Sequence, residues 1–542
     1  MRPLIATGAQ SAPLQMAIIR LFYFQLLIHV SCMCLSKEAF IIKWPETINI
    51  DSDIGMTLTD FTVITSEIDL LSNHRGVWGG QQSRMVATDE GVFATFIYKY
   101  PDDEWGTNDG YEWKDRRRVL LVMRPAACPG GKWVVLDKWA HNSNTPIIVA
   151  DARGNVYVVQ YENLNDETRH QWEYRPSVSK YIAGSWDTAT GTLTTPMVYH
   201  RWLDMPGLEP GVHGQITGAY TSANISPDGI IYILTADNVS AERTNIPDNL
   251  TGFMDIVAFD TNTQKWSAAA RLWTELRFCY MYLNFAPNAN GVGYDIEIIG
   301  NRDDFWSRTG YINLPNFGWI FDGFTYWRIS PEFPTTAGPT SSIPPKGYTG
   351  WKSPNFANIV KETVLIKETP SDYDSLDWWP NMIFSACGDV FWDNNGDIHM
   401  FYQRSDIASG QTPDQWHMLL RDGEIVFNKP LFPAPCTLTM LKDSGGNYYL
   451  LVSSNRSSAA DMYKAAVTND TGWEFEKIGS FELPVPMRQY GFSQAYIQGL
   501  AGHGDTVYVM YPIRGPQQRP EQDTADEWAY FRLNLILESS SI

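Results

Sequence analysis

Seven times along the chain, an apolar segment is followed by a tight turn with a glycine and then by a segment of alternating apolar and polar residues. This alternation has the period of two that places successive side chains on opposite faces of a β-strand. The glycine tolerates the positive φ that a tight hairpin turn requires. We therefore predict seven β-hairpins, with turns at Gly91, Gly154, Gly229, Gly291, Gly396, Gly446 and Gly504.

The turn glycines are mostly about 50 to 75 residues apart, a spacing typical of propeller blades. A single hairpin cannot bury both faces of its sheet, whereas radial repetition of four-stranded blades buries them and leaves few exposed edges. Other segments between the hairpins, such as "KWVVLDKW" and "WHMLLRDG", supply outer strands, and few segments show helical periodicity. The sequence predicts an all-β protein, a single seven-bladed β-propeller.

One interval between glycines, from Gly291 to Gly396, is too long for a single blade. It contains "FGWIFDGFTYWRIS", which is either a set of outer strands or part of an eighth blade, so an eight-bladed propeller stays open as the alternative. It also contains a stretch rich in Pro, Gly, Ser and Thr at about 330–358. Such a stretch is typical of a long surface loop, which either shapes a binding face or is a tolerated insertion.

The two ends of the chain predict how the ring closes and where the protein acts. Residues 1–36 read as a signal peptide with an N-terminal extension, because Arg20 precedes an apolar run too short to span a bilayer. Residues 37–542 form the propeller, closed by pairing "EAFIIKW" with "EWAYFRLNLIL". No later segment is long and apolar enough to cross a membrane. We expect a secreted, extracellular protein.

Composition narrows the class of partner. The net charge of -20 lacks the basic footprint of a nucleic-acid-binding protein. After removal of the signal, Cys128, Cys279, Cys387 and Cys436 remain, an even number that suits two disulfides. Three pairings are open, and Cys387–Cys436 is favoured because the two lie on neighbouring repeats. Glycosylation sequons, which fit a secreted glycoprotein, occur at Asn224, Asn238, Asn249, Asn455 and Asn469.

The second hairpin is preceded by an unusual loop in "WAHNSNTPIIVADARGNVYVV". His141, Asn142 and Pro146 come before the strand, and Arg153-Gly154 form the turn. The repeats are similar to those of the BNR-repeat, sialidase-like propeller superfamily. This stretch resembles the branch that contains the propeller polysaccharide (ulvan-type) lyases.

The lyase resemblance implies further site residues. It implies a second histidine at the end of the strand after the turn, where this chain has Tyr161 or Asn163. It also implies a tyrosine and an arginine flanking the next hairpin. Tyr220 matches the tyrosine, whereas Ala236 and Asp237 occupy the region of the arginine.

The chemistry of a uronate lyase selects the candidate catalytic residues. Such an enzyme neutralises the substrate carboxylate, removes the C5 proton and protonates the leaving oxygen. His141, His213, Tyr220 and Arg84 are the candidates, and each precedes or begins the first strand of a hairpin. Arg84 is similar to the first arginine of the sialidase carboxylate-binding triad. Each also has a structural interpretation as a loop or core residue with satisfied hydrogen bonds.

Candidate substrate-binding residues accompany this set. Trp139 and Asn142 flank His141, and "DYDSLDWWPN" provides Asp377, Trp378 and Trp379. Tryptophan rings stack on sugars, and the aspartate binds hydroxyls or a cation. This cluster is alternatively a packed start of the fifth blade.

Two functional hypotheses follow. The first is a secreted carbohydrate-active enzyme, a polysaccharide lyase or glycosidase, acting on an extracellular glycan at the mouth of the ring. The second is a propeller derived from such an enzyme that binds a glycan or protein without chemistry. The chain has no metal-ligand run or phosphate-binding glycine loop, so we predict no cofactor, and a calcium ion stays open. The sequence does not predict the oligomeric state.

Overall fold

The computed structural model describes twenty-three segments of the chain. They are residues 48–49, 56–68, 83–99, 117–126, 131–140, 146–163, 174–202, 220–238, 252–267, 270–273, 278–289, 291–303, 321–331, 359–367, 383–406, 414–433, 436–443, 445–454, 459–467, 472–485, 498–501, 506–514 and 526–535. All of them belong to a compact unit that covers Thr47–Ile542.

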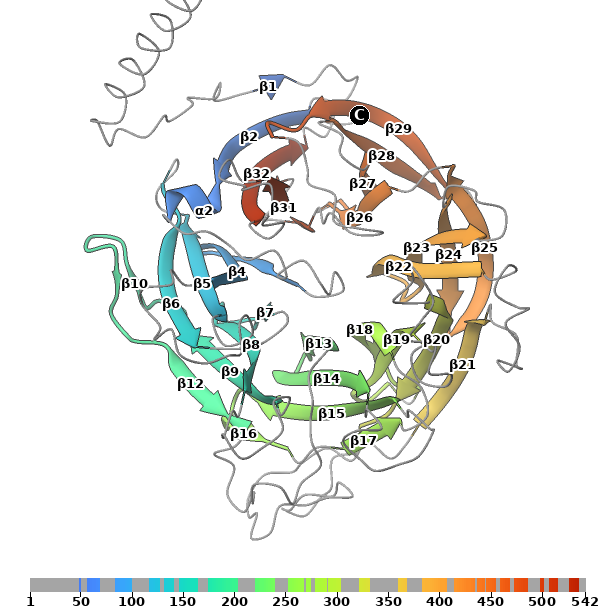
Figure 1. The fold of residues 1–542 in the computed structure, drawn as a ribbon, viewed down its shortest axis with the longest axis horizontal. Helices are drawn as coiled ribbons and strands as arrows, with labels where there is room; N and C mark the ends of the chain where they lie inside the picture. The colour runs from blue at the N-terminus through green and yellow to red at the C-terminus, as the bar shows by residue number, and fades with distance from the viewer. Residues whose placement is uncertain are drawn as a thin grey trace, which may run out of the picture. The chain divides into compact units, whose positions relative to one another are not determined.

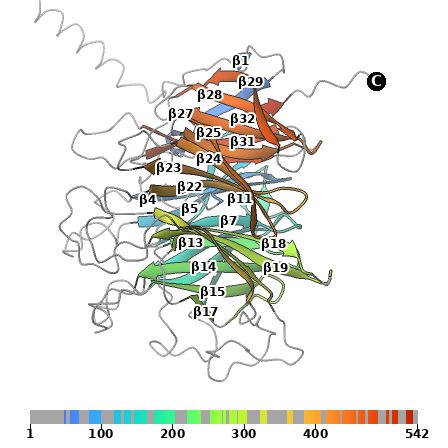
Figure 2. The same ribbon diagram turned by 90° about the vertical axis from the view of Figure 1, so that its right-hand side faces the viewer.

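The strands of this unit form small antiparallel sheets arranged around a ring (Figure 1). A blade is a set of neighbouring antiparallel strands that runs from the centre of the ring to its rim, and a single parallel bridge, Asp322↔Ser385, joins two of the blades into one larger sheet. Viewed at right angles, the strands run from one face of the ring to the other (Figure 2). This is the architecture of a β-propeller.

The first three blades follow one another along the chain, each in strand order from centre to rim. Blade 1 is β3 (Met85–Thr88), β4 (Gly91–Lys99), β5 (Arg117–Pro125) and β6 (Val134–Ala140). Blade 2 is β7 (Ile147–Ala150), β8 (Val156–Asn163), β9 (Tyr174–Tyr181) and β12 (Val198–Arg201), with a small hairpin of β10 (Trp186–Asp187) and β11 (Thr192–Leu193). Blade 3 is β13 (Tyr220–Ile225), β14 (Ile230–Asn238) and β15 (Gly252–Asp260), edged by β16 (Lys265–Trp266) and β17 (Ala270–Trp273).

The next three blades repeat the pattern. Blade 4 is β18 (Phe278–Pro287), β19 (Tyr294–Asp303), β20 (Phe321–Ile329) and β21 (Ile359–Lys367). Blade 5 is β22 (Ile383–Trp392), β23 (Ile398–Asp406), β24 (Asp414–Arg421) and β25 (Glu424–Phe432). Blade 6 is β26 (Cys436–Lys442), β27 (Tyr448–Ser454), β28 (Ala459–Val467) and β29 (Trp473–Glu482).

Blade 7 is built from both ends of the propeller sequence. Its inner strands are β30 (Gln498–Ala501), β31 (Thr506–Arg514) and β32 (Asp526–Leu535), and its outer strand is β2 (Met56–Val63) with the short β1 (Ile48–Asn49) beside it. A one-turn helix, α2 (Ile64–Glu67), follows β2. Closure by N- and C-terminal strands is confirmed. The N-terminal strand that pairs with β32 is β2 rather than residues 38–44, which lie outside the described residues.

The inner strands decide the number of blades. Neighbouring inner strands contact one another in an unbroken circle: β3, β7, β13, β18, β22, β26, β30 and again β3. The long interval between Gly291 and Gly396 contains β19, β20 and β21 of blade 4, followed by β22 of blade 5. The propeller is therefore seven-bladed, and all seven predicted hairpins are the first two strands of a blade. Most of the long Pro- and Gly-rich loop lies outside the described residues.

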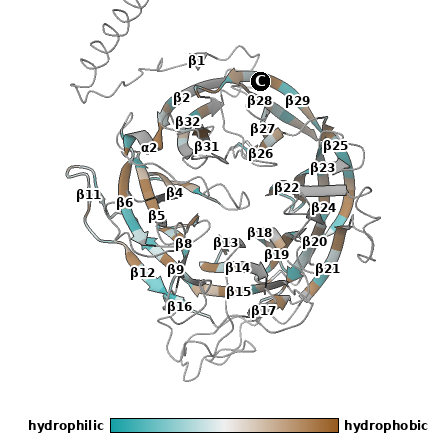
Figure 3. Cartoon of the chain, in the orientation of Figure 1, coloured by the Kyte–Doolittle hydropathy of each residue, from teal (hydrophilic) through white to brown (hydrophobic). Residues whose placement is uncertain are grey.

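The core consists of the contacts between blades, because each blade buries both faces. In β8, Tyr157 and Val159 pack toward blade 3, whereas Val156 and Val158 pack toward blade 1. This alternation with a period of two follows from the pleat of the strand. Figure 3 shows apolar residues along the strands of every blade.

Near the ring closure, a polar cluster joins blade 7 to blade 1. Arg124 at the end of β5 donates to both carboxylate oxygens of Asp60 in β2 and lies 3.7 Å from Glu67. The indole Nε1 of Trp133 donates to Thr62 at 3.0 Å, and its backbone N–H donates to Glu67 at 2.9 Å. The Arg124 and Asp60 side chains are 6% and 16% exposed, so the pair is largely desolvated. The Arg532 guanidinium also lies 3.7 Å from Asp60, so loss of Arg124 would remove the closer of two cations.

Two expectations about covalent chemistry are revised. The predicted disulfide between Cys387 and Cys436 is wrong, because Cys436 is a free, buried thiol. Nearby, Asp389 in β22 accepts hydrogen bonds from the Met440 N–H and the Thr439 hydroxyl in β26. Asn224, one of the five sequons, lies inside β13, and its side-chain amide donates to the Leu283 carbonyl oxygen of blade 4 at 3.1 Å.

We expect Arg124→Ala to lower the free energy of unfolding by about 2 kcal/mol, because it removes the hydrogen-bonded partner of the largely buried Asp60 carboxylate and leaves only the more distant Arg532 guanidinium. The control is Lys477→Ala, which breaks the more exposed ion pair with Asp461 (2.9 Å) and should cost less than about 1 kcal/mol. Denaturant unfolding of both variants measures the difference. Equal losses would contradict the role of the closure cluster.

A second pair of variants tests the packing between blades 4 and 5. Gly423 and Gly396 both have positive φ, of 74° and 82°. A Cβ at Gly423 would lie 2.3 Å from the Tyr326 ring, whereas a Cβ at Gly396 would meet nothing within 4 Å. Gly396→Ala should therefore cost about 1 to 2 kcal/mol for the left-handed backbone alone. Gly423→Ala should cost more, and equal losses in denaturant unfolding would contradict the contact.

Candidate functional site

The topology of the blades gives the ring two distinct faces. We call the face at which the inner strands β3, β7, β13, β18, β22, β26 and β30 begin the connection face, and the opposite one the turn face. Because neighbouring strands in a blade are antiparallel, every link from one blade to the next joins strand ends at the connection face. The turns between first and second strands lie at the turn face.

Most of the predicted site residues occur in the links between blades. His141 and Asn142 stand between β6 and β7, His213 stands between β12 and β13, and Asp377, Trp378 and Trp379 stand between β21 and β22. All six lie outside the described residues, so their roles stay predictions. The strand ends that flank them belong to the connection face.

Trp139 is next to last in β6 and is partly buried. Its ring packs against the apolar cluster shared by blades 1 and 2, which includes Phe93, Leu121 and Ile148. The buried part of the Trp139 ring therefore contributes to the packing between blades 1 and 2. Its predicted stacking on a sugar depends on the part that stays accessible.

Arg84 immediately precedes β3, at the connection face between blades 1 and 7. Its side chain is 2% exposed, and its guanidinium lies 5.5 Å from the ring centre of Trp528 in β32. Its carbonyl oxygen accepts a hydrogen bond from Thr95 N–H at 2.9 Å. A cation held over an indole in a desolvated site is stabilised by the ring quadrupole. The guanidinium is thus fixed inside the wall of the ring, which leaves little of it for direct contact with a ligand.

Tyr220 is the first residue of β13 and pairs with Ala236 in the ladder with β14. Its backbone therefore begins an inner strand at the connection face, as predicted. The residue opposite it is Ala236, in the region where the lyase pattern has an arginine.

A buried polar group between blades 1 and 2 was not predicted from the sequence. Gln160 is fully buried, and its side-chain amide donates to Ser179 Oγ at 3.0 Å. Tyr199 donates its hydroxyl hydrogen to Ser177 Oγ at 3.1 Å. Gln160 follows Val156 and Val158 on the strand face that packs against blade 1. The signal that could have found it is the glutamine that interrupts the apolar run "VYVVQY".

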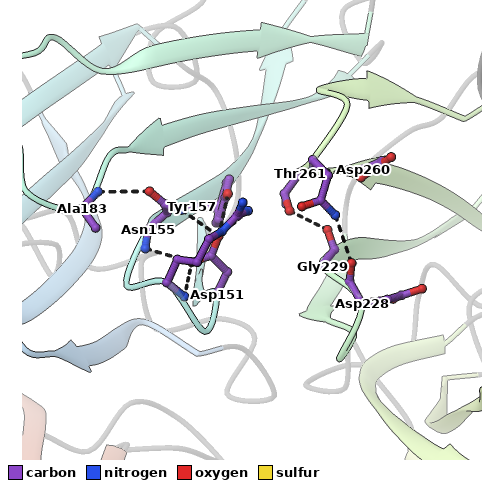
Figure 4. Close-up of polar contacts among 10 residues, drawn as sticks. Asp151, Asn155, Tyr157, Ala183, Asp228, Gly229, Asp260 and Thr261 are labelled. Carbon is purple, nitrogen blue, oxygen red and sulfur yellow. Dashed lines mark hydrogen bonds and ion pairs between the residues drawn. The ribbon is translucent and has the colours of Figure 1, made fainter.

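The turn face carries a repeated hydrogen-bonded turn. In the turn of blade 2, Asp151 accepts hydrogen bonds from Asn155 N–H (3.0 Å), Asn155 Nδ2 (2.8 Å) and the Tyr157 hydroxyl (3.1 Å), as Figure 4 shows. Burial alone would raise the pKa of Asp151, but these hydrogen bonds and one from Arg153 hold it below its usual value. The aspartate stabilises the turn and is not a candidate for proton transfer.

The same turn recurs in blades 5 and 6. Asp393 accepts from Asp397 N–H at 2.9 Å, and Asp443 accepts from Asn447 N–H at 2.8 Å and from the Tyr449 hydroxyl at 3.0 Å. The sequence signal is an aspartate, a glycine three residues later and a tyrosine or histidine six residues later. It explains these aspartates structurally, so the carboxylates at the turn face do not identify a hydrolase site.

Within the described residues, no group of three or more His, Cys, Asp or Glu side chains is arranged to hold a metal ion. A search of the same residues finds no helix long and apolar enough to cross a membrane. Neither observation extends to the links between blades.

Comparison with known proteins gives similarity at the level of solved structures. No family model and no curated protein match the chain. The polysaccharide lyase Uly1 is 15% identical, with 84% of this chain and 90% of that chain covered and a TM-score of 0.47. An ulvan lyase of polysaccharide lyase family PL25 is 10% identical over 82% of this chain and 92% of that chain, with a TM-score of 0.41.

A third structure is the intramolecular trans-sialidase from Ruminococcus gnavus. It is 8% identical over 72% of this chain and 95% of that chain, with a TM-score of 0.36. The three structures are thus two polysaccharide lyases and a trans-sialidase. Since identities and TM-scores are this low, the fold assignment rests on the seven blades of this chain.

We expect Asp151→Asn to lower the free energy of unfolding by about 2 kcal/mol at pH 7, because an amide cannot accept all three hydrogen bonds. The pKa of Asp151 is lowered in the folded state, so its stabilisation is present above the unfolded pKa of about 3.9 and is lost as the pH falls through the folded value.

We measure unfolding curves at pH 7, 4 and 2.5. The difference in free energy of unfolding between the wild type and Asp151→Asn should become smaller as the pH falls. Asp187→Asn is the control, since Asp187 makes similar bonds to Ala189 and Thr190 in an exposed hairpin and should cost less. A deficit that does not depend on pH would contradict this assignment.

Proposed function

We propose that the protein is a secreted, carbohydrate-active propeller that binds an extracellular polysaccharide at the connection face. One observation carries the proposal: the segments with His141, His213 and the Trp378-Trp379 pair all join strand ends of that face. They lead into blades 2, 3 and 5, so three links around one ring opening bring imidazole and indole groups. Aromatic and polar groups together are what a sugar-binding site requires.

We further propose β-elimination of a uronate as the reaction. A base removes the C5 proton, the C4–oxygen bond breaks, a double bond forms between C4 and C5, and the leaving oxygen takes up a proton. His141 is the proposed base and Tyr220 the proposed acid. The buried Arg84 guanidinium, fixed over Trp528, contributes positive charge to the wall of the site.

A second candidate function is glycan binding without catalysis. The observation that favours it is the register of β13 and β14, where Ala236 lies opposite Tyr220. The lyase pattern has an arginine in this region, and its side chain would neutralise the substrate carboxylate. Without that charge, elimination loses part of its electrostatic support, whereas stacking on tryptophan does not depend on it.

Activity on a panel of acidic and neutral polysaccharides tests the proposal. We expect the purified protein to release products that absorb in the ultraviolet through the new double bond. His141→Ala should lower that rate by about 100-fold or more, as expected for loss of a general base. The control is His200→Ala, which changes a histidine in β12 of blade 2 and should leave the rate unchanged.

The outcomes separate the two functions. Retention of a polysaccharide with neither ultraviolet-absorbing products nor new reducing ends would show binding without catalysis. Neither retention nor products on any polysaccharide would overturn the proposal. Equal activity of His141→Ala and the wild type would overturn the assignment of the base.

A further inference from the structure

Two buried histidines face each other between the blades, away from the connection face. His399 in β23 and His417 in β24 are both fully buried. His399 Nδ1 and His417 Nε2 are 3.0 Å apart, and the two rings stack with their centres 5.2 Å apart. One neutral ring can donate this hydrogen bond and the other accept it.

Aromatic side chains from blades 5 and 6 enclose the pair. The Trp473 ring lies 4.1 Å from that of His399, and the Phe401 ring stacks on His417 at 4.7 Å. Phe427 and Phe475 contact His417 at 5.0 and 5.6 Å between ring centres. Trp473 and Phe475 belong to β29 of blade 6, so the pair forms part of the joint between the two blades.

Few charged groups reach the pair. Asp393 Oδ2 lies 3.8 Å from His399 Nε2, and Asp397 follows in the same turn. On the other side, the Lys429 ammonium donates to the Trp473 carbonyl oxygen at 3.0 Å. The apolar cluster that includes these aromatic rings also contains the titratable groups of Cys436 in β26, Tyr448 in β27 and Tyr463 in β28, and Asp389 in β22 hydrogen-bonds to β26.

Protonation of the pair is disfavoured in the folded state. Burial lowers the pKa of His399, although Asp393 opposes this effect. Burial lowers the pKa of His417 well below its usual value, and the charges of His399 and Lys429 lower it further. A charged His417 would lose the hydrogen bonds of water inside this aromatic enclosure, and only His399 has a carboxylate, that of Asp393, close to it among the described residues.

We infer that the joint between blades 5 and 6 is an acid-sensitive element of the ring, which opens when the His399–His417 pair takes up protons. The geometry supports this because the two imidazoles stack at hydrogen-bond distance inside an aromatic enclosure that both blades form. Two charged rings so close would repel each other, and separation of the blades would expose both to water.

The sign of the pH effect follows from linkage. The folded joint keeps both rings neutral, whereas unfolded histidine binds a proton below about pH 6.5. Each histidine therefore lowers the folding equilibrium constant about tenfold per pH unit below that value, until the folded ring itself titrates. The two histidines together lower the folding equilibrium constant about a hundredfold per pH unit.

Asp389 in the same joint acts in the opposite direction. Burial raises its pKa to about 6, although its hydrogen bonds with Met440, Thr439 and Val390 oppose the rise. Its folded state therefore binds a proton between about pH 6 and 4 that the unfolded state does not, which raises stability about tenfold per unit. Asp389→Asn should remove this compensation, so the stability of the joint should fall more steeply as the pH is lowered.

Amide hydrogen exchange at pH 7.5, 6.5, 5.5 and 4.5, corrected for the intrinsic exchange rate, tests the inference. We expect opening of β23, β24 and β29 to increase at least tenfold per pH unit below 6.5 relative to β8 and β9 of blade 2. His417→Phe keeps an aromatic ring in the stack and should reduce this increase about tenfold per unit. His200→Phe, in the outer strand of blade 2, is the control: burial lowers the pKa of His200 as well, so this variant should alter the acid response of β9 and leave the opening of β23, β24 and β29 unchanged.

Two results would overturn the inference. One is acid opening that is equal in blades 2 and 5. The other is unchanged acid opening of blade 5 in His417→Phe. If His417→Phe does not fold, His399→Phe takes its place, because it removes the other ring of the pair: a smaller acid response in β23 and β24 supports the inference, and an unchanged response overturns it.

Discussion

The ladder between β2 and β32 joins the start of the propeller sequence to its end, and the ring depends on it. β2 pairs with β32 from Met56↔Leu535 to Val63↔Ala529, with an irregularity between Thr59 and Thr62. Each blade buries both faces against its neighbours, so an open ring would expose two blade faces at once. The contact of Arg124 with Asp60 fixes the same strand to blade 1. The β2–β32 ladder closes blade 7, and the Arg124–Asp60 ion pair joins that blade to blade 1.

The two faces of the ring differ in what their residues do. At the turn face, polar groups on aromatic side chains join neighbouring blades: Tyr181 donates to Glu90, Tyr294 to Asp228 and Trp392 to Glu297. Aspartates there stabilise turns. The predicted chemical groups instead occur in the links between strand ends of the connection face. Among the described candidates at the connection face, Arg84 and Trp139 also contact neighbouring blades, so the proposed site depends on the residues of the links.

The hairpins were predictable because alternation and turn glycines are local signals, and all seven are present. Partners distant in sequence were less predictable: the closing strand is β2 and not residues 38–44, and Cys436 is a free thiol and not half of the predicted Cys387–Cys436 disulfide. For the candidate site, the sequence identified inner-strand starts at Arg84 and Tyr220. It did not show that Arg84 is buried against Trp528, because that contact joins opposite ends of the chain.

The central claim is that a polysaccharide binds at the connection face. The most direct measurement is hydrogen-exchange footprinting of the whole protein with and without a polysaccharide that it retains. The account predicts protection in peptides that cover the links at 141–145, 203–219 and 368–382, with little change in the turns at 151–155 and 443–447. Protection of those turns with unchanged links would contradict it.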